Sequence, residues 1–218
     1  MIYVPSKNII FVKSRKTAST SIEIALSFLA RHDKKAVITT VDRKSEDFRS
    51  NYAVKPRNTI GRTNPFQDYY FSGGLIGARR ILGDFKHRRK YWNHMPISLV
   101  RARLGKDVFD KATKISIDRD RMDTILSHIN WKANQDDRIL ELKDYFCLFN
   151  PPDNDLLFTV KGKFSLDQVF YQERIKELYE WLESAFGERI PDQIKDFQSK
   201  AVIKKFTRYE LEQYLADE

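Results

Sequence analysis

A lysine and a run of hydroxyl side chains lie between an apolar segment and the start of an amphipathic one. Residues 16 to 21 read KTASTS, and they follow the apolar run Ile9 to Val12, which is typical of a short buried strand. The first turn of a helix has unpaired backbone N–H groups and a partial positive charge, so a loop that enters it can hold a phosphate or sulfate. Lys16 adds a full charge, and one hydroxyl can also cap the helix; the candidate donors are Thr17, Ser19, Thr20 and Ser21.

This loop differs from an ordinary ATP-binding loop. The Walker motif needs G-x-x-x-x-G-K-[ST], and no glycine occurs between Met1 and Asn58. An ATPase loop is therefore disfavoured. For this segment alone, the alternative is that the hydroxyls only cap a helix and that Lys16 lies in solvent.

A second segment has the same order of elements. Residues 114 to 132 read KISIDRDRMDTILSHINWK, in which a short apolar strand passes through a charged turn into an amphipathic helix. Arg119 lies at the strand exit, and Ser127 lies eight positions further on, inside the helix. Because ligands of α/β proteins bind beyond the carboxyl ends of the strands, the two loops can converge on one ligand.

Together the two segments resemble those of the sulfotransferase family, whose donor is 3′-phosphoadenosine-5′-phosphosulfate (PAPS). In that family a K-T-x-x-T-S loop cradles the 5′-phosphosulfate and an R-D-P-(x)n-S-H segment holds the 3′-phosphate. Arg119, Asp120, Ser127 and His128 match the second motif, although Arg121 stands where proline is usual. The resemblance implies that the donor is bound by Arg15, Lys16, Thr17, Ala18, Ser19, Thr20, Ser21, Arg119 and Ser127, with Lys16 also stabilising charge during transfer.

The segment around His94 extends the resemblance. His94-Met95-Pro96, followed by Leu104-Gly105, is similar to the carbohydrate 2-O-sulfotransferase branch, where a histidine in the equivalent position is expected to be catalytic. An imidazole, with an ordinary pKa near 6.5, suits the removal of a proton from an acceptor hydroxyl. His94 is the candidate general base, the alternative being a histidine that caps the helix after Pro96. His128 is left out of the catalytic set, and the scheme requires no metal.

The elements that must position these residues follow an alternating order. Strands are predicted over 8–13 and 36–41 with a helix over 20–31 between them, which makes a βαβ unit and a parallel sheet with helices on its faces. The resemblance implies an α/β three-layer sandwich of the P-loop nucleotide-hydrolase-like sulfotransferase fold, with residues 1–218 as one domain. Further helices are predicted between Pro96 and Gly105, over 175–186, and from Arg208.

Residues 42–90 lose this periodicity and contain several glycines and prolines, so we expect an irregular insertion and a candidate lid over the acceptor site. Its aromatic residues either pack as a lid or stack on a sugar ring. The basic cluster at 79–90 is either a solvated face or a wall of an acceptor site for an acidic substrate.

Composition limits the class of protein. Hydrophobic residues make up 41% and charged residues 32% of the 218, which is typical of a globular chain. No apolar run reaches the roughly 18 residues that span a bilayer, no signal-peptide pattern occurs, and Cys147 is the single cysteine. We therefore expect a soluble, cytoplasmic protein with no membrane partner, of bacterial or viral rather than eukaryotic secretory origin.

The formal charge of +9 favours an anionic ligand. The proposed reaction is sulfuryl transfer from PAPS to the hydroxyl of a small-molecule or saccharide acceptor, which leaves 3′,5′-adenosine bisphosphate. A carbohydrate is the expected acceptor, and it can itself be anionic. Two alternatives stay open: a P-loop-type, kinase-like phosphotransferase, and a basic, non-catalytic nucleic-acid-binding protein, although nucleic acid is the less favoured partner. The residues specify neither the acceptor nor the oligomeric state.

Overall fold

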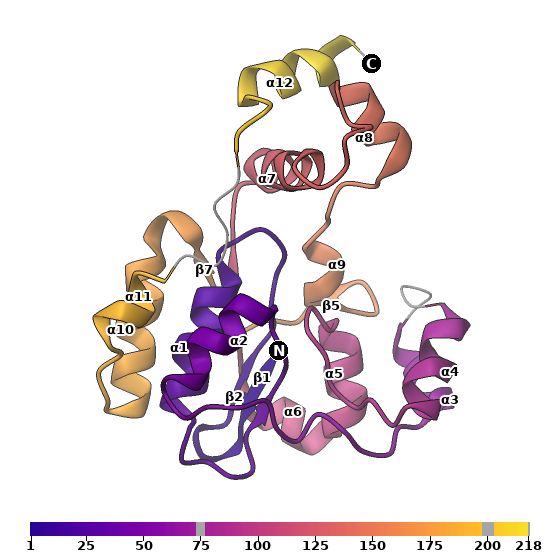
Figure 1. Cartoon of the computed structure of the whole chain (residues 1–218). Coiled ribbons are helices and arrows are strands. Elements are labelled where there is room, and N and C mark those ends of the chain that lie inside the picture. The colour runs from indigo at the N-terminus through magenta and orange to yellow at the C-terminus, as the bar shows by residue number, and fades with distance from the viewer. Residues whose placement is uncertain (73–76, 198–202, 218) are drawn as a thin grey trace.

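The computed structural model describes residues 1–72, 77–197 and 203–217, which form an α/β fold around a mixed central sheet (Figure 1). The sheet has the strand order β3-β1-β2-β4-β7. Its strands are β1 (Ile2–Val4), β2 (Ile9–Phe11), β3 (Val37–Ile38), β4 (Thr113–Asp118) and β7 (Gln168–Tyr171). Strands β2, β4 and β7 are parallel neighbours, so the loops that follow β2 and β4 leave the same edge of the sheet. A separate hairpin pairs β5 (Thr159–Val160) with β6 (Lys163–Phe164).

The prediction of a parallel sheet is wrong at one side. Strand β1, which the sequence pattern did not reveal, pairs antiparallel with both β2 and β3 and lies between them. The short turn Pro5–Lys7 joins β1 to β2, and so short a connection permits only an antiparallel pair. The predicted βαβ unit therefore exists as β2, α1 and β3 running in order, but its two strands are not neighbours.

Helices cover both faces of the sheet. Ile9 and Phe11 of β2 point into a core shared with α1 (Ser19–Leu29) and α10 (Ile175–Phe186), whereas Ile10 packs in a second core with α5 (Ile97–Leu104). This alternation follows from the two-residue period of a strand. Figure 1 shows the two groups of helices on opposite sides of the sheet. The shorter helices of these layers are α2 (Arg43–Ser50), α6 (Lys106–Lys111), α9 (Asp155–Phe158) and α11 (Asp192–Lys195).

A third apolar cluster lies beyond the carboxyl end of β4. It joins α7 (Arg121–Ala133), which follows β4 directly, to α8 (Leu142–Leu148) and α12 (Arg208–Asp217). Figure 1 shows these three helices together at the top of the molecule. The predicted strands, the helix after β2 and the helices after Pro96, after β7 and from Arg208 are thus confirmed, with boundaries that differ by a few residues. Pro96 itself is the N-cap residue of α5, and Gly105 ends that helix.

The expectation of an irregular segment over 42–90 is wrong in part, because residues 51–64 form neither a helix nor a named strand but much of the rest is helical. This segment forms α2, α3 (Pro65–Ser72) and α4 (Ala78–Lys86), while 73–76 lie outside the described residues. Buried Arg103 of α5 holds α3 and α4, because its guanidinium lies 2.8 Å from the carboxylate of Asp68 and 3.4 Å from that of Asp84. These ion pairs join distant parts of the chain, so no local pattern reveals them.

None of the helices in the described part of the chain is long and apolar enough to cross a membrane.

Candidate functional site

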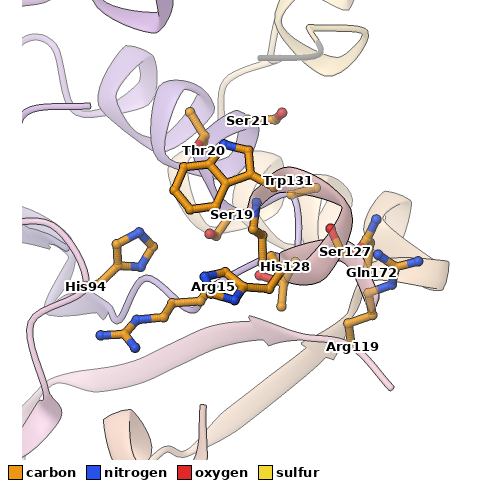
Figure 2. Close-up of a pocket in the computed structure, with 13 residues that line it drawn as sticks. Arg15, Ser19, Thr20, Ser21, His94, Arg119, Ser127, His128, Trp131 and Gln172 are labelled. Carbon is orange, nitrogen blue, oxygen red and sulfur yellow. The ribbon is translucent and has the colours of Figure 1, made fainter. Parts of the chain in front are cut away.

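The loops after β2 and β4 meet in one pocket, a cavity of about 600 Å³ that we call the first pocket (Figure 2). Every residue predicted to bind the donor lines it, and so does His94. The lining also includes His128, Trp131 and Gln172, which sequence reasoning did not assign to the site. Two segments about a hundred positions apart are brought together because β2 and β4 are adjacent parallel strands.

The backbone of the loop after β2 is shaped for an anion. Lys16 and Ala18 have φ angles of 62° and 58°, in the left-handed region that non-glycine residues seldom adopt. Such alternation turns neighbouring N–H groups toward one concave side, a geometry that binds anions. Ala18 is the N-cap of α1, so the hydroxyl cap that the sequence suggested does not form.

Several loop hydroxyls are bonded inside the protein. The Ser19 hydroxyl donates to the carbonyl of Ser14 at 2.7 Å, and the Ser21 hydroxyl donates to the carbonyl of Phe197 at 2.7 Å. Ser14 in turn bonds to Thr17 at 2.5 Å between hydroxyl oxygens and donates to the carbonyl of Ile117 in β4. A hydroxyl has a single proton to donate, so Ser19 and Ser21 hold the loop in shape rather than donate to a ligand in this arrangement.

Asn154 fixes the start of the loop, and sequence reasoning missed it. Its side-chain oxygen accepts from the Arg15 N–H at 2.8 Å, and its amide donates to the Arg15 carbonyl at 3.1 Å and to Asp118 at 3.0 Å. Asn154 lies in a segment that was expected only to be a loop, and a lone asparagine carries no signal of such a role. These bonds fix the Arg15 backbone, whereas the residue itself is exposed.

His94 is held in the tautomer that a general base requires. Its Nδ1 lies 3.2 Å from the carbonyl oxygen of Lys13. A carbonyl can only accept, so Nδ1 carries the proton and Nε2 keeps a lone pair. Burial, followed by the positive charge of Lys13, lowers the pKa of His94 to about 3, so the ring is neutral near pH 7.

A buried ion pair supports the Lys13 backbone. The Lys13 ammonium lies 2.7 Å from the Glu23 carboxylate of α1, and both side chains are almost fully buried. Burial raises the pKa of Glu23, but the positive charges of Lys13 and of the N-terminal ammonium, with hydrogen bonds from Lys13 and Thr39, together outweigh burial and hold the pKa at about 2. Glu23 also accepts from the Thr39 hydroxyl at 2.6 Å. Lys13, whose carbonyl oxygen orients His94, is therefore anchored to α1 by this ion pair.

Helix α7 forms another wall of the first pocket. Trp131 lies under the Lys16 ammonium, which is 4.1 Å from the centre of the ring. His128 Nδ1 lies 2.7 Å from the Tyr145 hydroxyl, and burial, with a contribution from Lys16, lowers the pKa of His128 to about 4. This histidine is therefore neutral near pH 7 and bonded within the α7–α8 cluster.

Arg119, Ser127 and Gln172 lie together at the side of the pocket away from His94, as Figure 2 shows. Arg119 forms an ion pair with Asp123, whose carboxylate lies 3.6 Å from the Arg119 guanidinium. Gln172 comes from the turn after β7, so the pocket draws on the carboxyl ends of three parallel strands. The first pocket thus has cationic groups at both ends, Arg15 on the side of His94 and Arg119 on the other (Figure 2).

A second pocket of about 510 Å³ adjoins the first and shares Arg15 and His94 with it. Arg80 of α4 and Trp92 line it, together with apolar residues such as Leu157. The Arg80 guanidinium lies 4.7 Å from the Trp92 ring. His94 therefore lines both cavities.

Comparisons of the chain with family models, with curated proteins and with solved structures found no match. Within the described residues, no group of three or more His, Cys, Asp and Glu side chains lies close enough to hold a metal ion.

Proposed function

We propose that the protein is a PAPS-dependent sulfotransferase with the sulfotransferase variant of the P-loop fold. The observation that carries the proposal is that the loop after β2, the Arg119–Ser127 segment and His94 all line the first pocket. The sequence resemblance assigned a complementary role to each of the three, and a ligand with phosphates at both ends needs them together.

The donor would lie along the first pocket. Its 5′-phosphosulfate would be held by the N–H groups at the start of α1, with Lys16 and Arg15 supplying positive charge. Its 3′-phosphate would be held by Arg119, whose planar guanidinium can make two parallel hydrogen bonds, and by the Ser127 hydroxyl. ATP lacks this second phosphate, so the Arg119 end would distinguish the two nucleotides.

The reaction would place an acceptor hydroxyl in line with the sulfur. A bond forms from the acceptor oxygen to the sulfur, the bond from the sulfur to the phosphate oxygen breaks, and the acceptor proton goes to Nε2 of His94. Lys16 would offset the charge that grows on the leaving 3′,5′-adenosine bisphosphate. Positioning and charge stabilisation supply most of the rate enhancement in such transfers.

The low pKa of His94 fits a base that acts only with the donor bound. Without ligand, burial and the Lys13 charge keep the ring neutral but make it a weak base. The negative charge of a phosphosulfate beside the ring opposes these effects and raises the pKa of His94 toward the reaction pH.

The second pocket is the proposed site of the acceptor, because it adjoins the first and shares His94 with it. Trp92 and Leu157 supply apolar surface to this pocket, and Arg80 and Arg15 favour an acceptor that carries an anionic group. This assigns part of the basic cluster at 79–90 to the acceptor wall. Other cations of that cluster are paired within the protein, as the Arg89 guanidinium lies 2.9 Å from the Asp84 carboxylate.

Titration calorimetry with 3′,5′-adenosine bisphosphate and with ATP, with and without magnesium, tests the proposal. We expect the bisphosphate to bind at least ~10-fold more tightly than ATP, since each charge-assisted contact to the 3′-phosphate is worth ~1.5–3 kcal/mol. Preferential, magnesium-dependent ATP binding would identify a phosphotransferase instead. Binding to DNA or RNA that weakens steeply with salt, together with no affinity for the bisphosphate, would indicate a nucleic-acid-binding protein.

A further inference from the structure

Two buried polar atoms at the Arg119 end of the first pocket have no hydrogen-bond partner among the described residues. They are Nε of Arg119 and the side-chain oxygen Oε1 of Gln172. Both residues line the pocket. Buried polar atoms are almost always paired, because an unpaired one loses its bonds to water and gains nothing in return. This pair therefore points to a ligand group.

The two atoms need different hydrogen-bonding groups on that ligand. Nε of Arg119 carries a hydrogen and can only donate, whereas Oε1 of Gln172 can only accept. A phosphate beside a guanidinium is held as the dianion, which has only acceptor oxygens, so it satisfies Arg119 but leaves Oε1 of Gln172 unpaired. With the amide oriented as in the structure, the ligand must present a donor next to its acceptor oxygens.

A ribonucleotide with a 3′-phosphate has such a donor. Its 2′-hydroxyl is attached to the carbon next to the one that bears the phosphate, so the hydroxyl lies beside the phosphate oxygens.

We propose that Gln172 accepts a hydrogen bond from the 2′-hydroxyl of the bound nucleotide. Gln172 is thus a specificity-determining residue that selects ribose over deoxyribose at the 3′-phosphorylated end of the ligand. The inference rests on the proposed function, since it assumes that the 3′-phosphate lies against Arg119 and Ser127.

Calorimetric titration with 3′,5′-adenosine bisphosphate and with its 2′-deoxy analogue tests this role. The unmodified protein is expected to bind the ribose form about 5- to 10-fold more tightly, the range of one net hydrogen bond. Gln172→Leu, which keeps the side-chain bulk but removes the acceptor, is expected to bind both forms with equal affinity. Ser127→Ala is the matched control, and it is expected to weaken both forms alike and to leave their ratio unchanged.

Equal affinity of the unmodified protein for the two nucleotides would overturn the role of Gln172, and this result needs no variant that folds. A ribose preference that persists in Gln172→Leu would overturn it as well. Both results differ from failure of the proposed function, in which neither bisphosphate binds more tightly than adenosine 5′-monophosphate.

Discussion

The two ends of the first pocket differ in how far their polar groups are already paired within the protein. Around His94, the loop hydroxyls of Ser19 and Ser21 donate to backbone carbonyls, and Asn154 bonds to both sides of Arg15. Around Arg119, by contrast, Nε of that residue and Oε1 of Gln172 have no partner among the described residues. The hydroxyls at one end are paired within the protein, whereas two polar atoms at the other end are not.

This difference matches the two tasks that the proposed function assigns. Catalysis depends on groups that are fixed before the transition state forms, because groups that must first reorganise lose part of their effect. Recognition instead gains from groups that are left unpaired without the correct ligand, because they penalise a wrong one. The His94 end is therefore expected to control the rate, and the Arg119 end the choice of nucleotide.

The largest expected effect is on turnover at the His94 end. His94→Gln keeps a hydrogen-bonding side chain but removes the base, and kcat is expected to fall ~10²–10⁴-fold, the usual contribution of general base catalysis. The dissociation constant of 3′,5′-adenosine bisphosphate is expected to stay within ~2-fold. Steady-state kinetics and calorimetry on the same preparation measure both. Unchanged turnover would remove His94 from the mechanism.

The next effect tests the support beneath His94. Lys13→Met leaves the buried Glu23 carboxylate without its main partner, and we expect the free energy of unfolding to fall by ~3 kcal/mol in urea denaturation. The N-terminal ammonium of Met1 also lies 3.2 Å from the Glu23 carboxylate, and burial lowers its pKa to about 6, so it is mostly neutral at pH 8. At that pH the double variant Lys13→Met with Glu23→Gln leaves no buried charge unpaired and is expected to recover much of the loss.

Lys106→Met is the matched control for that prediction, because Lys106 makes an exposed ion pair with Asp110 at 2.9 Å. Exposed pairs add little stability, so no measurable change in unfolding is expected. Equal losses in the Lys13 and Lys106 variants would contradict a structural role for the buried pair.

A smaller effect is expected on nucleotide binding at the Arg119 end of the pocket. Arg119→Ala is expected to weaken binding of 3′,5′-adenosine bisphosphate ~10–100-fold but to change binding of adenosine 5′-monophosphate by less than ~3-fold, because only the first ligand has a 3′-phosphate. Competition titrations with the two nucleotides give both ratios. Equal weakening of the two would show that Arg119 does not contact the 3′-phosphate.

The last effect is spread over several pH units and concerns stability. The pKa of His94 is about 3 in the folded protein, against about 6.5 when unfolded. Between these values the unfolded chain binds a proton that the folded chain does not, so the stability from neutral His94 is full above pH 6.5 and is lost as pH falls toward 3.

This single group contributes a slope of up to ~1.4 kcal/mol per pH unit. His94→Gln is expected to show a shallower decline of unfolding free energy between pH 6 and pH 4. His128 titrates with the same sign in both proteins and therefore cancels in the difference. Parallel stability curves for the two proteins would mean that His94 is not buried in its neutral form.

Local patterns predicted much of what positions the site. The apolar run of β2, the turn into α1 and the strand–turn–helix order around Arg119 each depend on residues close in sequence. Strand β1 was missed because three residues show too little alternation to indicate a strand. Helices α3 and α4 were missed because Arg103 fixes them through Asp68 and Asp84, contacts that only the folded chain creates.

The candidate site was predictable to a similar extent. Residues that belong to a motif, such as Lys16 and Arg119, line the first pocket as expected, although their roles stay predictions. Asn154 and Gln172 belong to no motif. Each is an isolated amide side chain whose role depends on its position in the folded chain, which the sequence does not show. Sequence reasoning also assigned the Ser19 and Ser21 hydroxyls to the ligand, whereas in the structure both donate to backbone carbonyls.

The most direct test of the central claim is a crystal structure of the protein with 3′,5′-adenosine bisphosphate bound. The account predicts the 5′-phosphate at the start of α1 beside Lys16, and the 3′-phosphate against Arg119 and Ser127. A nucleotide bound outside the first pocket, or bound with its two phosphates exchanged, would contradict the account.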